Sequence, residues 1–235
     1  METITKTADE VSFISDMNVS LANAIRRSVG EIPILAVVEA DIYKNDSALY
    51  DEVIAHRLGL VSLKNQKLKG DNSVEMKLKV KGKDEITEVL AGELGDDVVY
   101  PETPIVLLGK DQALEVVARA KVGKGNDHAK FMPGLVYYKH LPKIKISGDG
   151  EKQSELAELY PDAFEMFGEK LKVKSAAACD LDESDMKEYP GIDITFGDDL
   201  VFAIESWGQI EAKEIFSEAC KALKGNLSEV SKALK

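Results

Sequence analysis

Residues 74–81 alternate strictly between apolar and charged side chains, in the order Val74, Glu75, Met76, Lys77, Leu78, Lys79, Val80 and Lys81. Because successive side chains of a strand point to opposite faces, this period of two predicts a β-strand with one buried and one solvated face. Residues 114–122 repeat the pattern. A run rich in β-branched residues at 35–43 predicts another strand, and 136–138 and 143–146 predict two shorter ones.

Helical spacing appears near the N-terminus. A helix is predicted to begin at the capping residue Ser20 and to end near Gly30 and Pro33. Its apolar positions recur every three or four residues, at Leu21, Ile25, Val29 and Ile32. A second helix is predicted over 48–58, with Ser47 as its cap.

The longest apolar stripe lies at the other end of the chain, from about 209 to 234. It consists of Ala212, Phe216, Ala219, Leu223, Leu227, Val230 and Leu234. Gly225 and Asn226 interrupt it, so that one bent helix and two consecutive helices are equally expected. A stripe of this length needs a surface to pack on, either in its own domain or in a partner. Helices at both ends and strands between them predict the α+β class.

The charge balance disfavours binding to nucleic acid. The chain of 235 residues carries a net charge of −12, whereas affinity for a phosphate backbone comes mainly from Lys and Arg. The local groups Lys121, Lys124 and Lys130, and Lys139, Lys143 and Lys145, are interpreted as solvated charges.

The longest apolar run, 32–38, is far below the roughly 20 residues that cross a bilayer, and METITKTADE is no secretion signal. We therefore expect a cytoplasmic protein without membrane contact.

No motif for catalysis is found. The three histidines, His56, His128 and His140, are far apart and fit no zinc-binding spacing, and there is no Walker loop or nucleophile elbow. We expect neither metal nor cofactor, and no catalytic residue of the chain's own.

An internal repeat lies in the C-terminal half. Tyr160-Pro161 matches Tyr189-Pro190 and Phe167-Gly168 matches Phe196-Gly197, each at an offset of 29 residues. Two copies of one small unit are implied.

Four segments resemble one family in its order along the chain: 23–42 (NAIRRSVGEIPILAVVEADI), 51–63 (DEVIAHRLGLVSL), 124–133 (KGNDHAKFMP) and 202–210 (FAIESWGQI). The family is the D-type subunit of archaeal RNA polymerase, with the third-largest subunit of eukaryotic RNA polymerase II and, more distantly, the bacterial α subunit. The resemblance implies a discontinuous dimerisation domain, helices on a small sheet, formed by 1–44 and 198–235. It also implies an inserted β-rich domain over 45–147 and a ferredoxin-like domain over 148–197.

Many members of that family hold iron–sulfur clusters in the ferredoxin-like domain, with the ligand run C-x2-C-x2-C-x3-C-P. In this sequence the eight corresponding positions contain a single cysteine: Cys179, Asp182, Asp185 and Tyr189, and Gly150, Gln153, Leu156 and Tyr160. This set is too hard and too poor in thiolates for a cluster, so we expect the domain to lack one. Cys179 is then an inert thiol, and the space is filled by packing of Phe164, Met166, Phe167, Leu171 and Phe196.

The resemblance also implies partners. They are a small subunit resembling L, the second-largest subunit, and the small subunits N and P. The expected dimer interface consists of Leu21, Ile25, Val29, Phe216, Leu223, Leu227, Val230 and Leu234. The expected docking residues for larger subunits are Asn23, Arg26, Arg27, His56, Arg57 and His128.

Alternatives remain open from the residues alone. The two arginines of the first helix could be ordinary solvated charges, and His56 and His128 could be structural histidines. Two functions of other classes are also open: an electron carrier derived from a ferredoxin, and a free-standing DNA-binding regulator. The missing thiolates disfavour the first, and the acidic balance disfavours the second.

Overall fold

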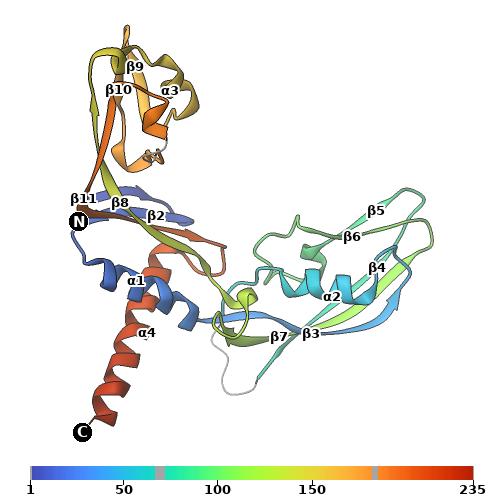
Figure 1. Ribbon diagram of the computed structural model, residues 1–235. Coiled ribbons are helices and arrows are strands. Elements are labelled where there is room, and N and C mark those ends of the chain that lie inside the picture. Colours follow the sequence, from blue (N-terminus) through green and yellow to red (C-terminus); the bar gives the residue numbers. More distant parts are fainter. Residues whose placement is uncertain (1, 67–71, 182–184, 235) are drawn as a thin grey trace. The chain divides into compact units, whose positions relative to one another are not determined.

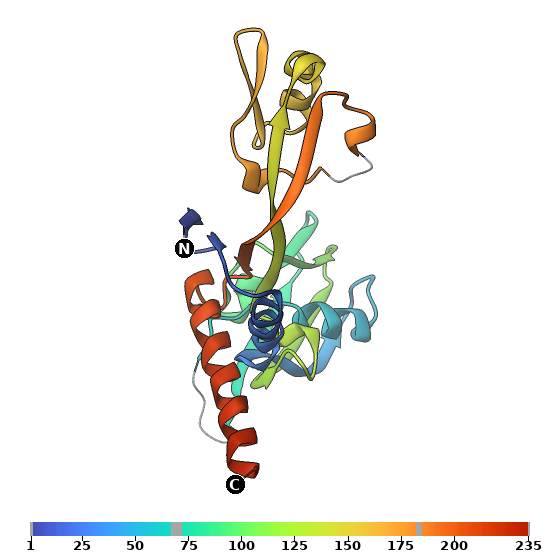
Figure 2. The same ribbon diagram turned by 60° about the vertical axis from the view of Figure 1, so that its left-hand side comes forward.

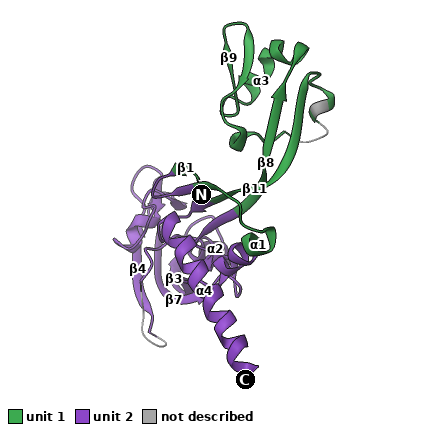
Figure 3. Cartoon of the chain, turned by 90° about the vertical axis from the view of Figure 1, so that its left-hand side faces the viewer, with its two compact units in different colours: residues 1–5, 12–23, 137–203 green, residues 6–11, 24–136, 204–235 purple. Residues whose placement is uncertain are grey.

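The computed structural model describes residues 2–66, 72–181 and 185–234. Its chain divides into two compact units, which Figure 3 shows in different colours. One unit combines residues 1–5, 12–23 and 137–203, and the other combines 6–11, 24–136 and 204–235.

A four-stranded sheet has the order β1-β2-β11-β8. Its strands are β1 (Glu2–Lys6), β2 (Glu10–Ser15), β11 (Ile192–Ser206) and β8 (Gly134–Ile146). Phe13 and Phe202 stack in it, with ring centroids 5.6 Å apart. The two short strands predicted at 136–138 and 143–146 are in fact one strand. Pro142 does not break it, because β8 is the edge strand, where a residue without an N–H group is tolerated.

A three-stranded antiparallel sheet is the framework of the second unit. Its order is β3-β7-β4, formed by Pro33–Asn45, Ala113–Lys124 and Val74–Lys81. The strands predicted at 35–43, 74–81 and 114–122 are therefore confirmed. Met76 and Leu78 are buried while Glu75, Lys77 and Lys79 face solvent, as the alternation predicts. A hairpin of β5 (Thr87–Leu90) and β6 (Pro104–Leu108) also belongs to this unit.

Helix α2 (Asp51–Gly59) packs on β3 and buries Ile54 and Leu58 (Figure 1). It begins three residues later than predicted. The reason is that Ser47 forms a turn instead of a cap, with its N–H and hydroxyl both donating to the Asn45 side chain, the latter at 2.6 Å.

Helix α1 (Val19–Ser28) continues into the 3-10 turn η1 (Val29–Glu31). The predicted cap was two residues off. Ser20 donates its N–H to the side-chain oxygen of Asn18 at 2.8 Å, so Asn18 satisfies the free amide at the helix start.

Helix α4 (Ala212–Ala233) is one continuous helix, which Figure 2 shows in red. Of the two outcomes that the sequence left open, one helix and two consecutive helices, the structure has the first, and Gly225 and Asn226 lie inside the helix. An exposed glycine within a helix costs only about 1 kcal/mol, which a helix of 22 residues can absorb. Its first turns bury Ala212, Ile215 and Ala219 and contact η1.

The segment 148–197 contains helix α3 (Ser154–Leu159) and a hairpin of β9 (Phe164–Phe167) and β10 (Lys170–Val173). Two of the residues predicted to fill its core, Phe164 and Leu171, do so. Met166, Phe167 and Phe196 do not, and they are 37%, 68% and 50% exposed. Phe167 lies on the face of β9 opposite Phe164, whereas Met166 and Phe196 share a face with Phe164 and Ile194 but lie beyond the cover that buries those residues. The remaining core positions are taken by Leu156, Ala163, Cys179, Leu181, Ile192 and Ile194.

Candidate docking site

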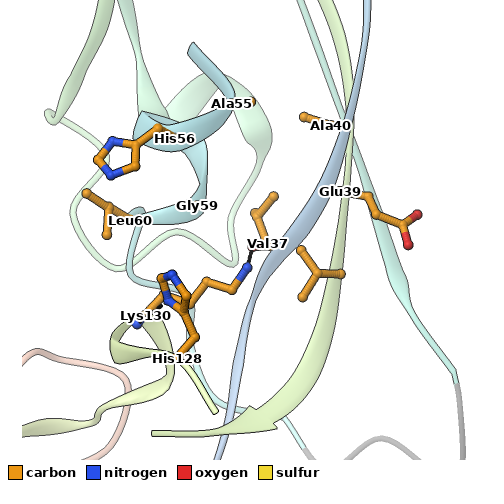
Figure 4. Close-up of a pocket in the computed structure, with 10 residues that line it drawn as sticks. Val37, Glu39, Ala40, Ala55, His56, Gly59, Leu60, His128 and Lys130 are labelled. Atoms are coloured by element: carbon orange, nitrogen blue, oxygen red, sulfur yellow. Dashed lines mark hydrogen bonds between the residues drawn. The ribbon is translucent and has the colours of Figure 1, made fainter. Parts of the chain in front are cut away.

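A hollow of about 180 Å³ lies where α2, β3 and the 3-10 turn η3 (Ala129–Phe131) meet. Figure 4 shows the side chains that line it, among them His56, Leu60, His128 and Lys130. Two of the predicted docking residues, His56 and His128, thus come together from distant parts of the sequence. Both belong to the same compact unit.

The orientation of His56 follows from the packing of α2. Ile54 and Leu58 point into the core, so that His56 and Arg57 remain exposed between them. The helix ends at Gly59, and Leu60 follows with 57% of its surface exposed. A polar imidazole and an apolar side chain therefore stand next to each other at the mouth of the hollow.

The turn η3 is anchored by Phe131, which is buried against β7. A Cβ atom on Gly123 would lie 2.5 Å from the Phe131 ring, so the ring position requires a glycine there. At the start of the turn, Nδ1 of His128 accepts a hydrogen bond of 3.1 Å from the N–H of Lys130. This bond leaves the proton of the neutral imidazole on Nε2.

Lys130 is a member of the site that the sequence did not indicate. The prediction that Lys130 is a solvated charge is wrong. Its Nζ donates to the carbonyl oxygen of Val37 at 3.0 Å and lies 5.3 Å from the centre of the Phe131 ring. Burial lowers the pKa of Lys130 below its ordinary value. The only signal in the sequence is its place next to His128, because the carbonyl that holds it belongs to a strand far away in the chain.

Arg57 does not line this hollow. It lies beside a more apolar one of about 440 Å³, together with Glu88, Val106 and Leu107. On α1, Arg26 and Arg27 are exposed and Asn23 is half-buried. The role of all six predicted docking residues stays a prediction.

The residues of the predicted dimer interface fall into three groups. Ile25 and Val29 are buried within the chain. Phe216 and Leu223 are half-buried. Leu21, Leu227, Val230 and Leu234 are exposed, the last three at 62%, 57% and 83%. The exposed part of the stripe on α4 is thus its C-terminal half, and in Figure 3 these turns run clear of the other elements of their unit.

The eight positions that correspond to cluster ligands do not fit an iron–sulfur group. Leu156 and Cys179 belong to one apolar core, against which Tyr160 and Tyr189 pack. A Cβ atom on Gly150 would lie 2.5 Å from the carbonyl oxygen of Gly191, so no ligating side chain has space there. Gln153 and Asp185 are half-buried, and Asp182 lies outside the described residues. Burial also raises the pKa of the Cys179 thiol, which opposes the thiolate form that a metal needs.

We expect Cys179→Ser to reduce the stability of the segment without changing its metal content. The serine would place a hydroxyl group in an apolar core, because Cys179 is only 3% exposed. The expected loss is about 1–2 kcal/mol in the free energy of unfolding. Denaturant unfolding and the iron content of the purified protein are measured together. The control is Cys220→Ser, which replaces a half-buried cysteine of α4. Stoichiometric iron in the wild type that disappears in Cys179→Ser would contradict this expectation.

Among the described residues, no helix is long and apolar enough to span a membrane.

The comparisons with known proteins agree with one another. A family model described as the RNA polymerase Rpb3/RpoA insert domain matches residues 38–134. The sequence is 35% identical to DNA-directed RNA polymerase subunit Rpo3 of Pyrococcus horikoshii, over 93% of this chain and 91% of that relative. The sequence is 36% identical to Rpo3 of Thermococcus kodakarensis, over 93% of this chain and 91% of that relative. It is 32% identical to Rpo3 of Methanothermobacter thermautotrophicus, over 96% of this chain and 95% of that relative.

Proposed function

The chain belongs to the family of DNA-directed RNA polymerase subunit Rpo3, and from this membership we propose that it is a non-catalytic assembly subunit of that enzyme. In this proposal it works in the cytoplasm, through surfaces rather than through a reaction. It pairs with a small subunit resembling L, and the pair forms a platform on which the second-largest subunit and the small subunits N and P dock.

The observation that carries the proposal is the exposed apolar stripe of α4. Leu227 and Val230 lie on one face of the helix, and Leu234, its C-cap, continues the same spacing of three and four residues. Monomeric proteins rarely expose such a continuous apolar surface, and partner helices or sheets are its usual cover. These residues are the proposed contact with the small subunit, and Leu21 of α1, which is exposed on the other compact unit, is proposed as a separate contact.

The docking of larger subunits is proposed for a different set of residues. Arg26 and Arg27 are exposed on α1, while Ile25 and Val29 are buried. His56 and His128 converge on the hollow beside β3. Planar guanidinium groups and imidazoles are suited to hydrogen bonds with carboxylates and carbonyl groups at an interface.

The two rival functions have little physical support. An electron carrier would need about four thiolate ligands for each cluster, whereas the eight corresponding positions contain one cysteine, which is buried in an apolar core. A DNA-binding regulator would need a basic surface, whereas the chain has a net charge of −12.

We expect the chain produced alone to self-associate, and co-expression with a homologue of the small L-type subunit to give a monodisperse pair. The physical reason is that the stripe on α4 is covered either by its partner or by another copy. Size-exclusion chromatography of both preparations measures the difference. A stable monomer of the chain alone, with no tendency to pair, would contradict an obligate partner.

A further inference from the structure

Lys130 is a partly buried cation whose charge has no carboxylate partner in the part of the chain that the structure describes. The two contacts of its ammonium group are neutral: the carbonyl oxygen of Val37 at 3.0 Å and the ring of Phe131 at 5.3 Å. An ammonium group has three donors, so two remain for another acceptor. A cation that has lost water without gaining a counter-charge is destabilised, which its lowered pKa reflects.

The acidic residue that lines the hollow, Glu39, cannot supply that counter-charge. Glu39 contributes to the lining, but its carboxylate is held by Arg119 at 3.4 Å and by Lys121 at 3.5 Å. Figure 4 shows the Glu39 carboxylate on the opposite side of β3 from Lys130. The cation therefore faces the hollow alone.

The other polar groups at the mouth are also suited to an acceptor. His128 has its neutral-state proton on Nε2, because Nδ1 accepts the N–H of Lys130. His56 reaches the same hollow from the last turn of α2. Leu60 adds an exposed apolar side chain beside them. A carboxylate, which only accepts hydrogen bonds when ionised, matches this set.

The size of the hollow favours a single side chain over a small-molecule ligand. Its volume is about 180 Å³, below the roughly 300 Å³ at which pockets for drug-sized ligands begin.

We propose that an aspartate or glutamate side chain of the second-largest subunit enters this hollow and pairs with Lys130. This inference rests on the proposed function, which proposes His56 and His128 for the docking of larger subunits and names the second-largest subunit as the large subunit that docks. A carboxylate placed there forms charge-assisted hydrogen bonds with a cation that is already half-buried, so the pair contributes to the affinity of the two subunits as well as to their relative position.

The test measures the affinity of the co-expressed heterodimer for the second-largest subunit. Lys130→Met keeps the apolar stem and removes the charge, and we expect it to weaken binding about 10- to 100-fold. Lys130→Arg keeps the charge and should retain most of the affinity. The matched control is Lys121→Met, a lysine of the same unit that already pairs with Glu39, and it should bind like the wild type.

The outcomes separate the inference from the function on which it rests. A folded Lys130→Met heterodimer that binds as tightly as the wild type overturns the inference and leaves the proposed function standing. A wild-type heterodimer that shows no binding to the second-largest subunit overturns both.

A zero-length carbodiimide cross-link identifies the source of the carboxylate, because it joins an ammonium group only to a carboxylate in direct contact. We expect mass spectrometry to find Lys130 linked to an acidic residue of the second-largest subunit in the assembled complex. A link from Lys130 to any other subunit overturns the assignment.

Discussion

Leu227→Asp is expected to abolish pairing with the small subunit. In the chain alone this leucine is 62% exposed, so the substitution leaves the fold of the chain intact. In the proposed pair it lies in an apolar seam, where an aspartate must be desolvated without a partner. That costs several kcal/mol, which corresponds to a loss of affinity of about a thousandfold. Co-purification at micromolar concentration measures the effect.

The control places the same charge on the adjacent residue. Ser228→Asp introduces an aspartate about 100° further around α4, outside the stripe, and should not disturb pairing. Retention of the pair in Leu227→Asp would show that the C-terminal half of α4 is not the interface. Loss of the pair in both variants would mean that charge on α4, rather than its position, decides pairing.

Arg26→Glu combined with Arg27→Glu is expected to block recruitment of the second-largest subunit and to leave the pair with the small subunit intact. At 100° per residue from Leu21, the stripe falls between about 20° and 80°, whereas the two arginines fall near 140° and 240°. The structure agrees with this separation, since Ile25 and Val29 are buried and both arginines are exposed. Reversal of two charges at an interface should weaken docking a hundredfold or more in a reconstitution pull-down.

The charge reversal also acts on the helix itself. Both arginines lie in the last turn of α1, where cations are favoured by the helix dipole, so the double variant should lose about 1 kcal/mol of stability. A melting curve of the heterodimer checks this smaller effect. Arg26→Lys with Arg27→Lys serves as the control, because it keeps the charge and removes the planar fork. Normal recruitment by the folded glutamate variant would identify the arginines as solvated charges.

Local patterns were enough to identify the strands of the β3-β7-β4 sheet. The alternation at 74–81 arises because the side-chain period of a strand is two whatever surrounds it, and the observed burial follows it. The same reasoning failed at helix starts. Ser20 and Ser47 are both good capping residues, but Asn18 and Asn45 lie two residues earlier and accept the N–H groups of the two serines themselves.

The core of the segment 148–197 shows a second limit. Apolar residue type predicted that Phe167 and Phe196 are buried, yet they are 68% and 50% exposed. Small residues such as Ala163 and Cys179 are buried in their place. Which face of a strand is covered, and how far along the strand the cover extends, depends on the neighbouring elements, and the residue types alone do not contain that information.

The sequence by itself determined the family, the acidic character that disfavours DNA, the loss of cluster ligands and the periodicity of the main helices and strands. Each of these depends on residue identity or on neighbours within a few positions. Only the tertiary structure decided that Ile25 and Val29 are buried while Leu227 and Val230 are exposed, although the two stripes have the same spacing. It also decided that Lys130 faces a hollow with His56 and His128, because the carbonyl of Val37 that holds it is brought there by the pairing of distant strands.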